Sequence, residues 1–248
     1  MKMIDNRLQS LADMVCITGG GGKNTVVADI GSDHAYLPIW LWRNKKIKRA
    51  FASDISVSSV EKIKKNILKY RISHEIIVPV LSDGLAAFDN NFYDSGEITH
   101  IVIAGMGGNN IANIIESSDI ARQKILILQP NSKVGFLREF LCRNKFEITD
   151  ENLIIDNGRF YTAMCANYNI NANTGDIDML DMIIGEHIRK KQPACYKEYV
   201  ERQISRLKNI LLDLDSKDIS EREFIQTEYG NYGDIEKLLT FLFAEKEK

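Results

Sequence analysis

Two carboxylates and a histidine lie close together in the segment DIGSDH, at Asp29, Asp33 and His34. The segment ends an apolar run, TVVADIG, that is typical of a parallel strand buried on both faces. In doubly wound α/β folds, ligands bind at the carboxyl ends of such strands. Gly31 would let the chain turn tightly there and let a ligand approach the backbone. Because two carboxylates would repel a pyrophosphate, the segment favours a neutral or positively charged ligand.

Acidic residues also close the next two predicted strands. Asp54 ends the predicted strand 47–55, where an acid commonly accepts hydrogen bonds from ribose hydroxyls. Asp83 lies at the end of the third strand and would suit an adenine amino group. Each could instead be an ordinary turn residue, and Asp29 could merely cap the following helix. Together they fit S-adenosylmethionine, which carries a sulfonium, an ammonium and a nucleoside.

Glycines and amides close the fourth and fifth predicted strands. AGMGG, at residues 104–108, has three glycines in four positions, so a flat base could lie against its backbone. A close helix–sheet contact is the alternative explanation for these glycines. The amides of Gln129 and Asn131, in QPN, are suited to hydrogen bonding with a base edge.

The elements that carry these residues alternate as in a doubly wound α/β sheet. We predict helices at 6–15, 35–44, 57–71, 109–118 and 133–144, and strands at 25–31, 47–55, 75–85, 98–108 and 124–131. Residues 146–168 then form two strands joined at Asn157-Gly158, a frequent hairpin turn. Nicotinamide-binding domains normally continue strand–helix units to the end. The closing hairpin therefore indicates a Rossmann-like class I methyltransferase with a seven-stranded mixed sheet.

Four consecutive glycines, Gly19 to Gly22, precede the first strand. A phosphate-binding loop follows a strand and has a different spacing to its lysine. We interpret the glycines as a flexible linker.

A change in composition divides the chain into a catalytic domain, 1–168, and a helical domain, 169–248. Val200, Leu207 and Leu214 recur every seven residues in the second part, as in a helical hairpin or short coiled coil. A helical cap over the main sheet is the alternative.

Basic residues are concentrated between Arg43 and Arg71, where ten lysines and arginines face two acids. Such a patch is suited to neutralising phosphates. A second basic group, which includes Arg189 and Arg202, lies in the helical part. Solvated helix faces are the alternative for both, and we favour nucleic acid for the first.

The composition is that of a globular protein: 248 residues, 44% hydrophobic and 27% charged, with a net charge of −2. It excludes a disordered or collagen-like chain. The four cysteines lie far apart, so we expect no disulfide framework and no metal site. No signal-peptide core or membrane-length apolar run is present, so we expect a cytoplasmic protein. We also expect a monomer, with His74 and His100 structural or solvated.

Five segments in order, VADIGSDHAYLP, SDGL, IVIAGMGG, LILQPN and NGRFY, resemble the bacterial TrmK family. The resemblance covers about the first two thirds of the chain, and the helical remainder matches the family's layout. It implies an S-adenosylmethionine-dependent methyltransferase acting on N1 of adenosine 22 in tRNA. It also implies a C-terminal coiled-coil-like domain that helps to hold the tRNA.

On this hypothesis Asp33 stabilises the methylated adenine or takes its N6 proton, and His34 positions Asp33. The expected cofactor-binding residues are Asp29, Gly31, Ser32, Asp54, Ile55, Asp83, Gly84, Ala104, Gly105 and Met106. The expected substrate-binding residues are Gly107, Gly108, Asn131 and Tyr161 at the base, with Lys62, Lys64 and Lys65 at the tRNA backbone.

Three other functions remain open from the residues. Another RNA base could be the target, because position 22 comes from the resemblance alone. A non-catalytic RNA-binding module is the second alternative, which the complete acidic and glycine motifs argue against. A nicotinamide-dependent dehydrogenase is the third, disfavoured by the absence of G-x-G-x-x-G and by the closing hairpin.

Overall fold

The computed structural model describes residues 4–20, 22, 24–172, 174–175, 177–214 and 232–247. The chain divides into two compact units, Met1–Gly175 and Asp176–Lys248. The functional domains expected at 1–168 and 169–248 stay a prediction.

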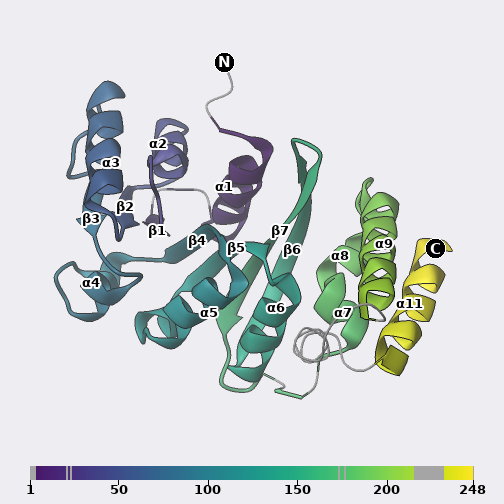
Figure 1. Ribbon diagram of the computed structural model, residues 1–248. Helices are drawn as coiled ribbons and strands as arrows, with labels where there is room; N and C mark the ends of the chain where they lie inside the picture. The colour runs from purple at the N-terminus through teal and green to yellow at the C-terminus, as the bar shows by residue number, and fades with distance from the viewer. Residues whose placement is uncertain are drawn as a thin grey trace. The chain divides into compact units, whose positions relative to one another are not determined.

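Unit 1 is built on a seven-stranded sheet of order β3-β2-β1-β4-β5-β7-β6 (Figure 1). The strands are β1 (Val26–Ile30), β2 (Arg49–Asp54), β3 (Ile77–Leu81), β4 (His100–Gly107), β5 (Ile125–Ser132), β6 (Phe146–Asp156) and β7 (Arg159–Tyr168). Strands β1 to β5 are parallel, and β7 is antiparallel to both β5 and β6. The predicted mixed sheet of a Rossmann-like methyltransferase is confirmed.

Helices cover both faces of this sheet. They are α1 (Asn6–Thr18), α2 (Tyr36–Arg43), α3 (Val57–Lys69), α4 (Ala86–Asp89), α5 (Gly108–Glu116) and α6 (Val134–Arg143), with short 3₁₀ turns η1 (Ser95–Glu97) and η2 (Ile120–Gln123). Ala28 and Ile101 point into the core beneath α4, α5 and α6. Val27 and Val102 point the other way, towards α1 and α2, while α3 packs on β2 and β3. Strand alternation thus fixes which side chains face each helical layer.

The hairpin turn between β6 and β7 has the backbone that the sequence indicated. Asn157 and Gly158 have φ angles of 48° and 72°. Two consecutive positive φ values define the type I′ turn, whose twist matches that of the flanking strands. The turn therefore returns β7 into the sheet beside β5.

Unit 2 contains four described helices: α7 (Met179–Ile183), α8 (Glu186–Lys191), α9 (Tyr196–Leu214) and α11 (Tyr232–Glu247). The Tyr196 hydroxyl donates to Glu245 Oε2 at 2.9 Å. Since Tyr196 begins α9 and Glu245 lies near the end of α11, the two helices are antiparallel. Leu207 of α9 and Leu242 of α11 are buried. The helical character is confirmed, whereas coiled-coil geometry stays a prediction, and the Leu214 side chain lies outside the described residues.

Among the residues that the structure describes, none of the helices combines the length and the apolar character that a membrane span requires. No group of three or more His, Cys, Asp or Glu residues is placed to hold a metal within the same ranges. Gly21 lies outside the described residues, so the linker interpretation of the glycine run stays a prediction.

Candidate active site

The turn after β1 is fastened to the end of β2. The Gly31 and Ser32 amides both donate to the Ser53 carbonyl, at 2.8 and 2.9 Å. Gly31 has a φ of 72°, and a Cβ there would lie 2.2 Å from Met106 Cε. The position favours glycine for its backbone conformation, and a Cβ there would also displace the flexible end of the Met106 side chain.

Asp29 is a buried carboxylate at this turn. It is 7% exposed, and the Ser32 hydroxyl donates to its Oδ2 at 2.5 Å. Burial raises the pKa of Asp29 to about 6, and the neighbouring charge of Asp54 adds to the effect. Helix α2 starts from Ala35 without a side-chain cap, so the alternative role of Asp29 as its cap is wrong. With a pKa of about 6, the carboxylate is ionised at neutral pH, and a cationic group bound beside it would stabilise that charge.

Asp33 is a half-exposed anion held by three side chains. Lys62 Nζ lies 2.9 Å and Ser59 Oγ 3.1 Å from its Oδ1. His34 Nε2 lies 3.2 Å from its Oδ2. The hydrogen bond from Lys62 is the main reason why the pKa of Asp33 lies below its ordinary value. Such a carboxylate is suited to stabilising positive charge and poorly suited to accepting a proton.

His34, beside Asp33, is held by residues of two different helices. The His34 ring stacks on Tyr36 of α2, with centroids 5.2 Å apart. Asn66 of α3 donates to the His34 carbonyl at 2.9 Å. Packing between α2 and α3 therefore sets the position of the Asp33-His34 pair.

Asp54 and Asp83 lie at the ends of β2 and β3, on the same edge of the sheet as Asp29. The Asp54 carboxylate accepts from the amides of Ser56, at 2.9 Å, and Asp33, at 3.3 Å. Asp83 is exposed, and so is Ile55 after β2. Three acids thus follow adjacent parallel strands, as the strand ends predicted.

The glycines at the end of β4 and the start of α5 differ in how closely other atoms approach them. Gly105 has a φ of 79°, and its carbonyl accepts from Asn131 Nδ2 at 2.7 Å. Gly108 is buried at the start of α5, where a Cβ would lie 2.4 Å from the Lys133 carbonyl oxygen. Gly107 is looser, with Ser132 Oγ at 3.3 Å from such a Cβ. A close helix–sheet contact explains Gly108, and its contact with a base stays a prediction.

Two side chains at this edge have no motif that marks them in the sequence. Arg7 of α1 donates from Nη1 to Gln129 Oε1 at 3.3 Å and lies over the Tyr161 ring at 5.7 Å from its centroid. Ser59 of α3 is the other, through its bond to Asp33. An arginine on the polar side of an amphipathic helix is an ordinary solvent-facing residue by pattern alone, so sequence reasoning missed it.

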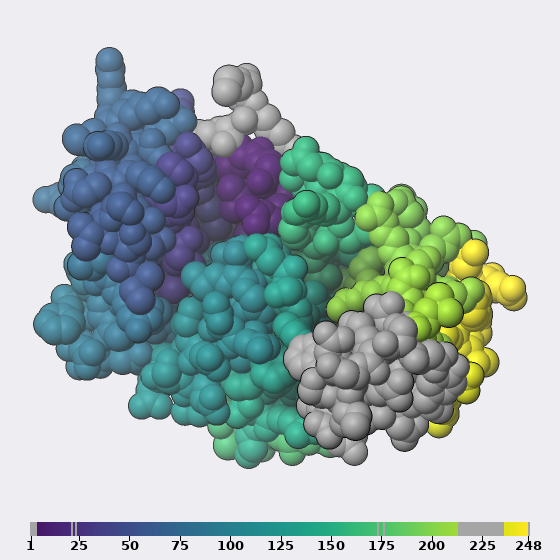
Figure 2. Space-filling model, in the orientation of Figure 1, coloured from purple at the N-terminus to yellow at the C-terminus, as the bar shows by residue number. Residues whose placement is uncertain are grey.

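The three lysines of α3 that were predicted to contact tRNA have different surroundings in the structure. Lys62 points to Asp33, Lys64 forms an ion pair with Glu61 at 2.8 Å, and Lys65 is exposed. Helix α3, in blue, forms part of the outer surface of unit 1 (Figure 2). The exposed α3 lysines are therefore available to an anionic partner, and only Lys62 of the three also contacts the predicted catalytic pair.

Part of the second basic group is paired within unit 2. Arg189 Nη2 lies 2.7 Å from Asp181 Oδ1, and Nη1 lies 3.8 Å from Glu245 Oε1. Arg202 Nη2 lies 3.2 Å from Glu198 Oε1. The Arg189 pairs join α8 to α7 and α11, whereas the Arg202 pair lies within α9.

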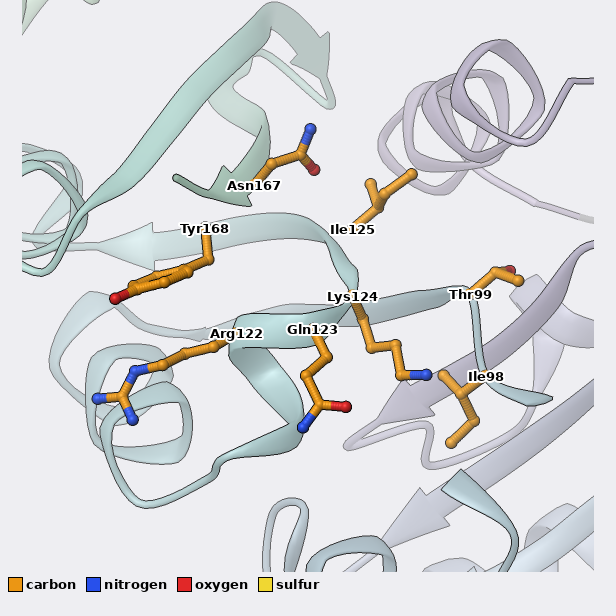
Figure 3. Close-up of a pocket in the computed structure, with 8 residues that line it drawn as sticks. All are labelled: Ile98, Thr99, Arg122, Gln123, Lys124, Ile125, Asn167 and Tyr168. Carbon is orange, nitrogen blue, oxygen red and sulfur yellow. The ribbon is translucent and has the colours of Figure 1, made fainter. Parts of the chain in front are cut away.

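A pocket of about 390 Å³ lies at the opposite edge of the sheet, where β5 begins and β7 ends (Figure 3). It is lined by Ile98, Thr99, Arg122, Gln123, Lys124, Ile125, Asn167 and Tyr168. None of the predicted site residues lines it. The predicted residues gather instead at the carboxyl edge.

The side chains at the carboxyl edge fit S-adenosylmethionine. A buried carboxylate at Asp29 suits an ammonium, and Asp54 and Asp83 add acceptors for ribose and adenine groups. At Gly31 the space that a Cβ would take is occupied by the tip of the Met106 side chain.

Comparisons with known proteins agree with this arrangement. The family model described as "TrmK: tRNA (adenine(22)-N(1))-methyltransferase" matches residues 27–231. The Bacillus subtilis protein of that name is 29% identical over 84% of both chains.

Two solved structures have ligands named in their descriptions. M. capricolum TrmK with S-adenosyl-homocysteine is 27% identical, with a TM-score of 0.74 over 97% of this chain and 100% of that one. A Streptococcus pneumoniae putative tRNA (m1A22) methyltransferase with S-adenosyl-L-methionine is 27% identical, with a TM-score of 0.73 over 95% and 99%. Because the family model matches residues 27–231, well over half of the chain, this chain belongs to the TrmK family.

Proposed function

We propose that this protein transfers a methyl group from S-adenosylmethionine to N1 of adenosine 22 in tRNA. The observation that carries the proposal is the row of Asp29, Asp54 and Asp83 at three adjacent strand ends, beside the glycine loop of β4, in a member of this family. The relatives with bound S-adenosyl-L-methionine and S-adenosyl-homocysteine support the cofactor.

The carboxylates divide the binding of the cofactor between them. When bound, S-adenosylmethionine supplies a methyl group on positively charged sulfur. Asp29 and Gly31 would hold its methionine end, Asp54 its ribose and Asp83 its adenine. Ionised Asp29 gains a counter-charge in this role, which offsets the desolvation that raises its pKa.

Adenine N1 carries a lone pair and is unprotonated near neutral pH, so its attack requires no general base. Alignment of the reacting atoms is then the main contribution of the protein, worth up to about 7–11 kcal/mol. The adenine becomes cationic as it is methylated, and the Asp33 anion stabilises that charge. Since the pKa of Asp33 is lowered by Lys62, we assign it electrostatic stabilisation rather than proton transfer.

Adenine N1 is normally covered within a base pair, so the target base must leave the stack. Asn131 and Tyr161, next to the Gly105 loop, would line the side that receives it. The exposed lysines of α3 would contact the tRNA backbone.

The test is methyl transfer from labelled S-adenosylmethionine to two unmodified tRNA transcripts, with adenosine or guanosine at position 22. Label in the adenosine transcript alone is expected. Label in both would move the target to another base. Label in neither, with cofactor binding retained in calorimetry, would indicate another RNA substrate. Loss of cofactor binding as well would favour a non-catalytic RNA-binding module.

Asp33→Asn tests the assigned role, because it keeps the shape of the side chain and removes the charge. We expect methyl transfer to fall by about 10²-fold or more with cofactor affinity unchanged. Asp119→Asn, at an exposed position near the opposite edge of the sheet, is the matched control. Near-normal turnover of the Asp33 variant would overturn the assignment.

The expected cytoplasmic location and monomeric state belong to the same proposal. Sedimentation of the purified protein with and without tRNA tests the second. In the absence of RNA, one species with the mass of the monomer is the expected result.

A further inference from the structure

Arg7 reaches the predicted target-base side of the site from the start of the chain. It belongs to α1, whose docking on the sheet is provided by buried Leu11, Met14 and Val15. Asp5 caps the helix by accepting from the Leu8 amide at 2.7 Å. The docking is made by apolar side chains, and the Arg7 guanidinium contacts the cap through Nη2, which lies 3.9 Å from Asp5 Oδ2. Its Nη1 is directed instead to Gln129 at the rim of the site.

The Arg7 guanidinium begins a chain of three hydrogen bonds that passes through Gln129 and Asn131 to the Gly105 carbonyl. Gln129 is fully buried, and its Nε2 donates to the Pro130 carbonyl at 2.9 Å and to Asn131 Oδ1 at 3.1 Å. Both amide hydrogens of Gln129 are thereby used, and Oε1 accepts from Arg7 at 3.3 Å. Asn131 Nδ2 in turn donates to the Gly105 carbonyl at 2.7 Å. The chain of contacts runs from α1 through β5 to the β4 loop.

This order of donors and acceptors depends on Arg7. Without it, Gln129 Oε1 is a buried acceptor that has lost its charged donor, which is unfavourable. A rotation of the Gln129 amide that relieves this would place an oxygen against Asn131 Oδ1. Asn131 would then turn as well and release the Gly105 carbonyl.

We propose that Arg7 is a positioning residue for the target base, acting through Gln129 to fix the Asn131 amide and the Gly105 peptide. This rests on the proposed function, because the base side of the site is defined by it. The Tyr161 ring, with its centroid 5.7 Å from the guanidinium carbon, holds the plane of Arg7. Asn131 is exposed, so its second amide hydrogen faces the space where a base edge would lie.

Arg7→Ala and Arg7→Lys, with Asn131→Ala and the double variant Arg7→Ala/Asn131→Ala, test the proposal. We expect Arg7→Ala to lower kcat by about 10- to 100-fold, as a small misplacement of reacting groups does. The cofactor Kd, measured by calorimetry, should stay within about 3-fold, which is under 1 kcal/mol. Arg7→Lys should recover little, because an ammonium lacks the flat fork that the Tyr161 ring and Gln129 hold.

The double variant separates a chain of contacts from independent effects. If Arg7 acts through Asn131, the double variant loses no more activity than Asn131→Ala alone. Multiplied losses, or an unchanged kcat in Arg7→Ala, would overturn the proposal. Arg122→Ala is the matched control, since Arg122 lies over Tyr168 at 6.0 Å, near the opposite edge (Figure 3). It should leave kcat unchanged.

A readout without tRNA keeps this proposal distinct from the proposed function. In a ¹H–¹⁵N spectrum of the protein alone, Arg7→Ala should shift the Asn131 side-chain amide and the Gly105 amide, and Arg122→Ala should shift neither. Unshifted signals would overturn the positioning role even if the wild type methylates tRNA. Shifted signals in a protein that fails to methylate either transcript would contradict the proposed function and leave the chain of contacts supported.

Discussion

The burial of the Asp29 carboxylate lowers the free energy of unfolding of the protein at neutral pH. Its pKa is raised to about 6 by burial, so the folded state binds this proton more tightly than the unfolded chain does. The stabilising contribution of the group is complete below the ordinary value of 3.8 and is lost as the pH rises to about 6. At neutral pH the protein therefore carries an unfavourable buried anion that its ligand can neutralise.

Asp29→Asn removes that anion and keeps an acceptor for the Ser32 hydroxyl. We expect it to raise the free energy of unfolding at pH 7 by roughly 1–3 kcal/mol and to weaken cofactor binding. Urea unfolding at pH 4 and pH 7, with calorimetric titration of S-adenosylmethionine, measures both. The gain should vanish at pH 4. A variant that is less stable at pH 7, or that binds the cofactor as well as the wild type, contradicts this role.

Variants of Lys62 and Lys65 can distinguish the effect of a charge beside the Asp33-His34 pair from the effect of a charge elsewhere on the surface. Both lie on α3 and both lie on its exposed side, but of these two Lys62 contacts Asp33. Lys62→Ala should lower kcat and raise the pKa of Asp33, because its main stabilising hydrogen bond is lost. Lys65→Ala should leave kcat unchanged.

Both lysine variants should weaken tRNA binding and reduce its dependence on salt, by up to about one unit of slope each. Methyl-transfer rates and tRNA titrations over a range of salt concentrations are the measurements. Equal effects of the two variants on kcat would remove the positioning role of Lys62. An unchanged salt slope in both variants would mean that the exposed side of α3 is an ordinary solvated helix face.

At the scale of elements, His100 joins the end of α1 to the start of β4. The Thr18 hydroxyl, which donates to the Met14 carbonyl at 2.7 Å, lies 3.0 Å from His100 Nε2. The Thr99 hydroxyl lies 2.8 Å from the other ring nitrogen. His100 is 2% exposed, and burial lowers its pKa to about 4. The sequence expectation that this histidine is structural or solvated is met by a buried, neutral ring.

The sign of this pH dependence is opposite to that of Asp29. A histidine whose folded pKa lies below 6.5 loses its contribution to stability as the pH falls from about 6.5 to about 4. We expect the wild type to lose roughly 2–3 kcal/mol from this group between pH 7 and pH 4. His100→Gln should be less stable at pH 7 and lack this part of the acid dependence. Urea unfolding at pH 7, 5.5 and 4 tests it, with exposed His74→Gln as the control. The same acid dependence in both variants would contradict the prediction.

At the scale of the whole molecule, unit 1 has the apolar cores that a stable domain requires. The clusters on both faces of the sheet are formed by residues between Ile4 and Ala166. A chain ending at Gly175 is therefore expected to fold and to bind S-adenosylmethionine with an affinity near that of the full chain. It should bind tRNA more weakly, because the helical part is expected to help to hold the RNA.

Circular dichroism, cofactor calorimetry and tRNA titration of this shortened chain and the full chain measure these outcomes. A shortened chain that fails to fold contradicts the independence of unit 1. Equal tRNA affinity of the two proteins contradicts the predicted role of residues 169–248.

The sequence by itself determined the order of the seven strands and of the five longer helices in unit 1, whereas the short helix α4 and the two 3₁₀ turns were not predicted. Buried parallel strands show as apolar runs, and Asn157-Gly158 shows the hairpin, because these signals depend on neighbours along the chain. The acids Asp29, Asp54 and Asp83 could be placed on one edge for the same reason, since parallel strands end on the same side.

Only the tertiary structure decided which side chains meet at that edge. Arg7 and Gln129 are 122 positions apart, and their contact depends on how α1 docks on β5. Lys62 was predicted to face tRNA, and it holds Asp33 because α3 packs beside the β1 turn. Gly108 looked like part of a base-binding loop, and the Lys133 carbonyl against it is visible only after packing. Local patterns encode the elements, whereas contacts between elements arise from long-range packing, which local periodicity does not record.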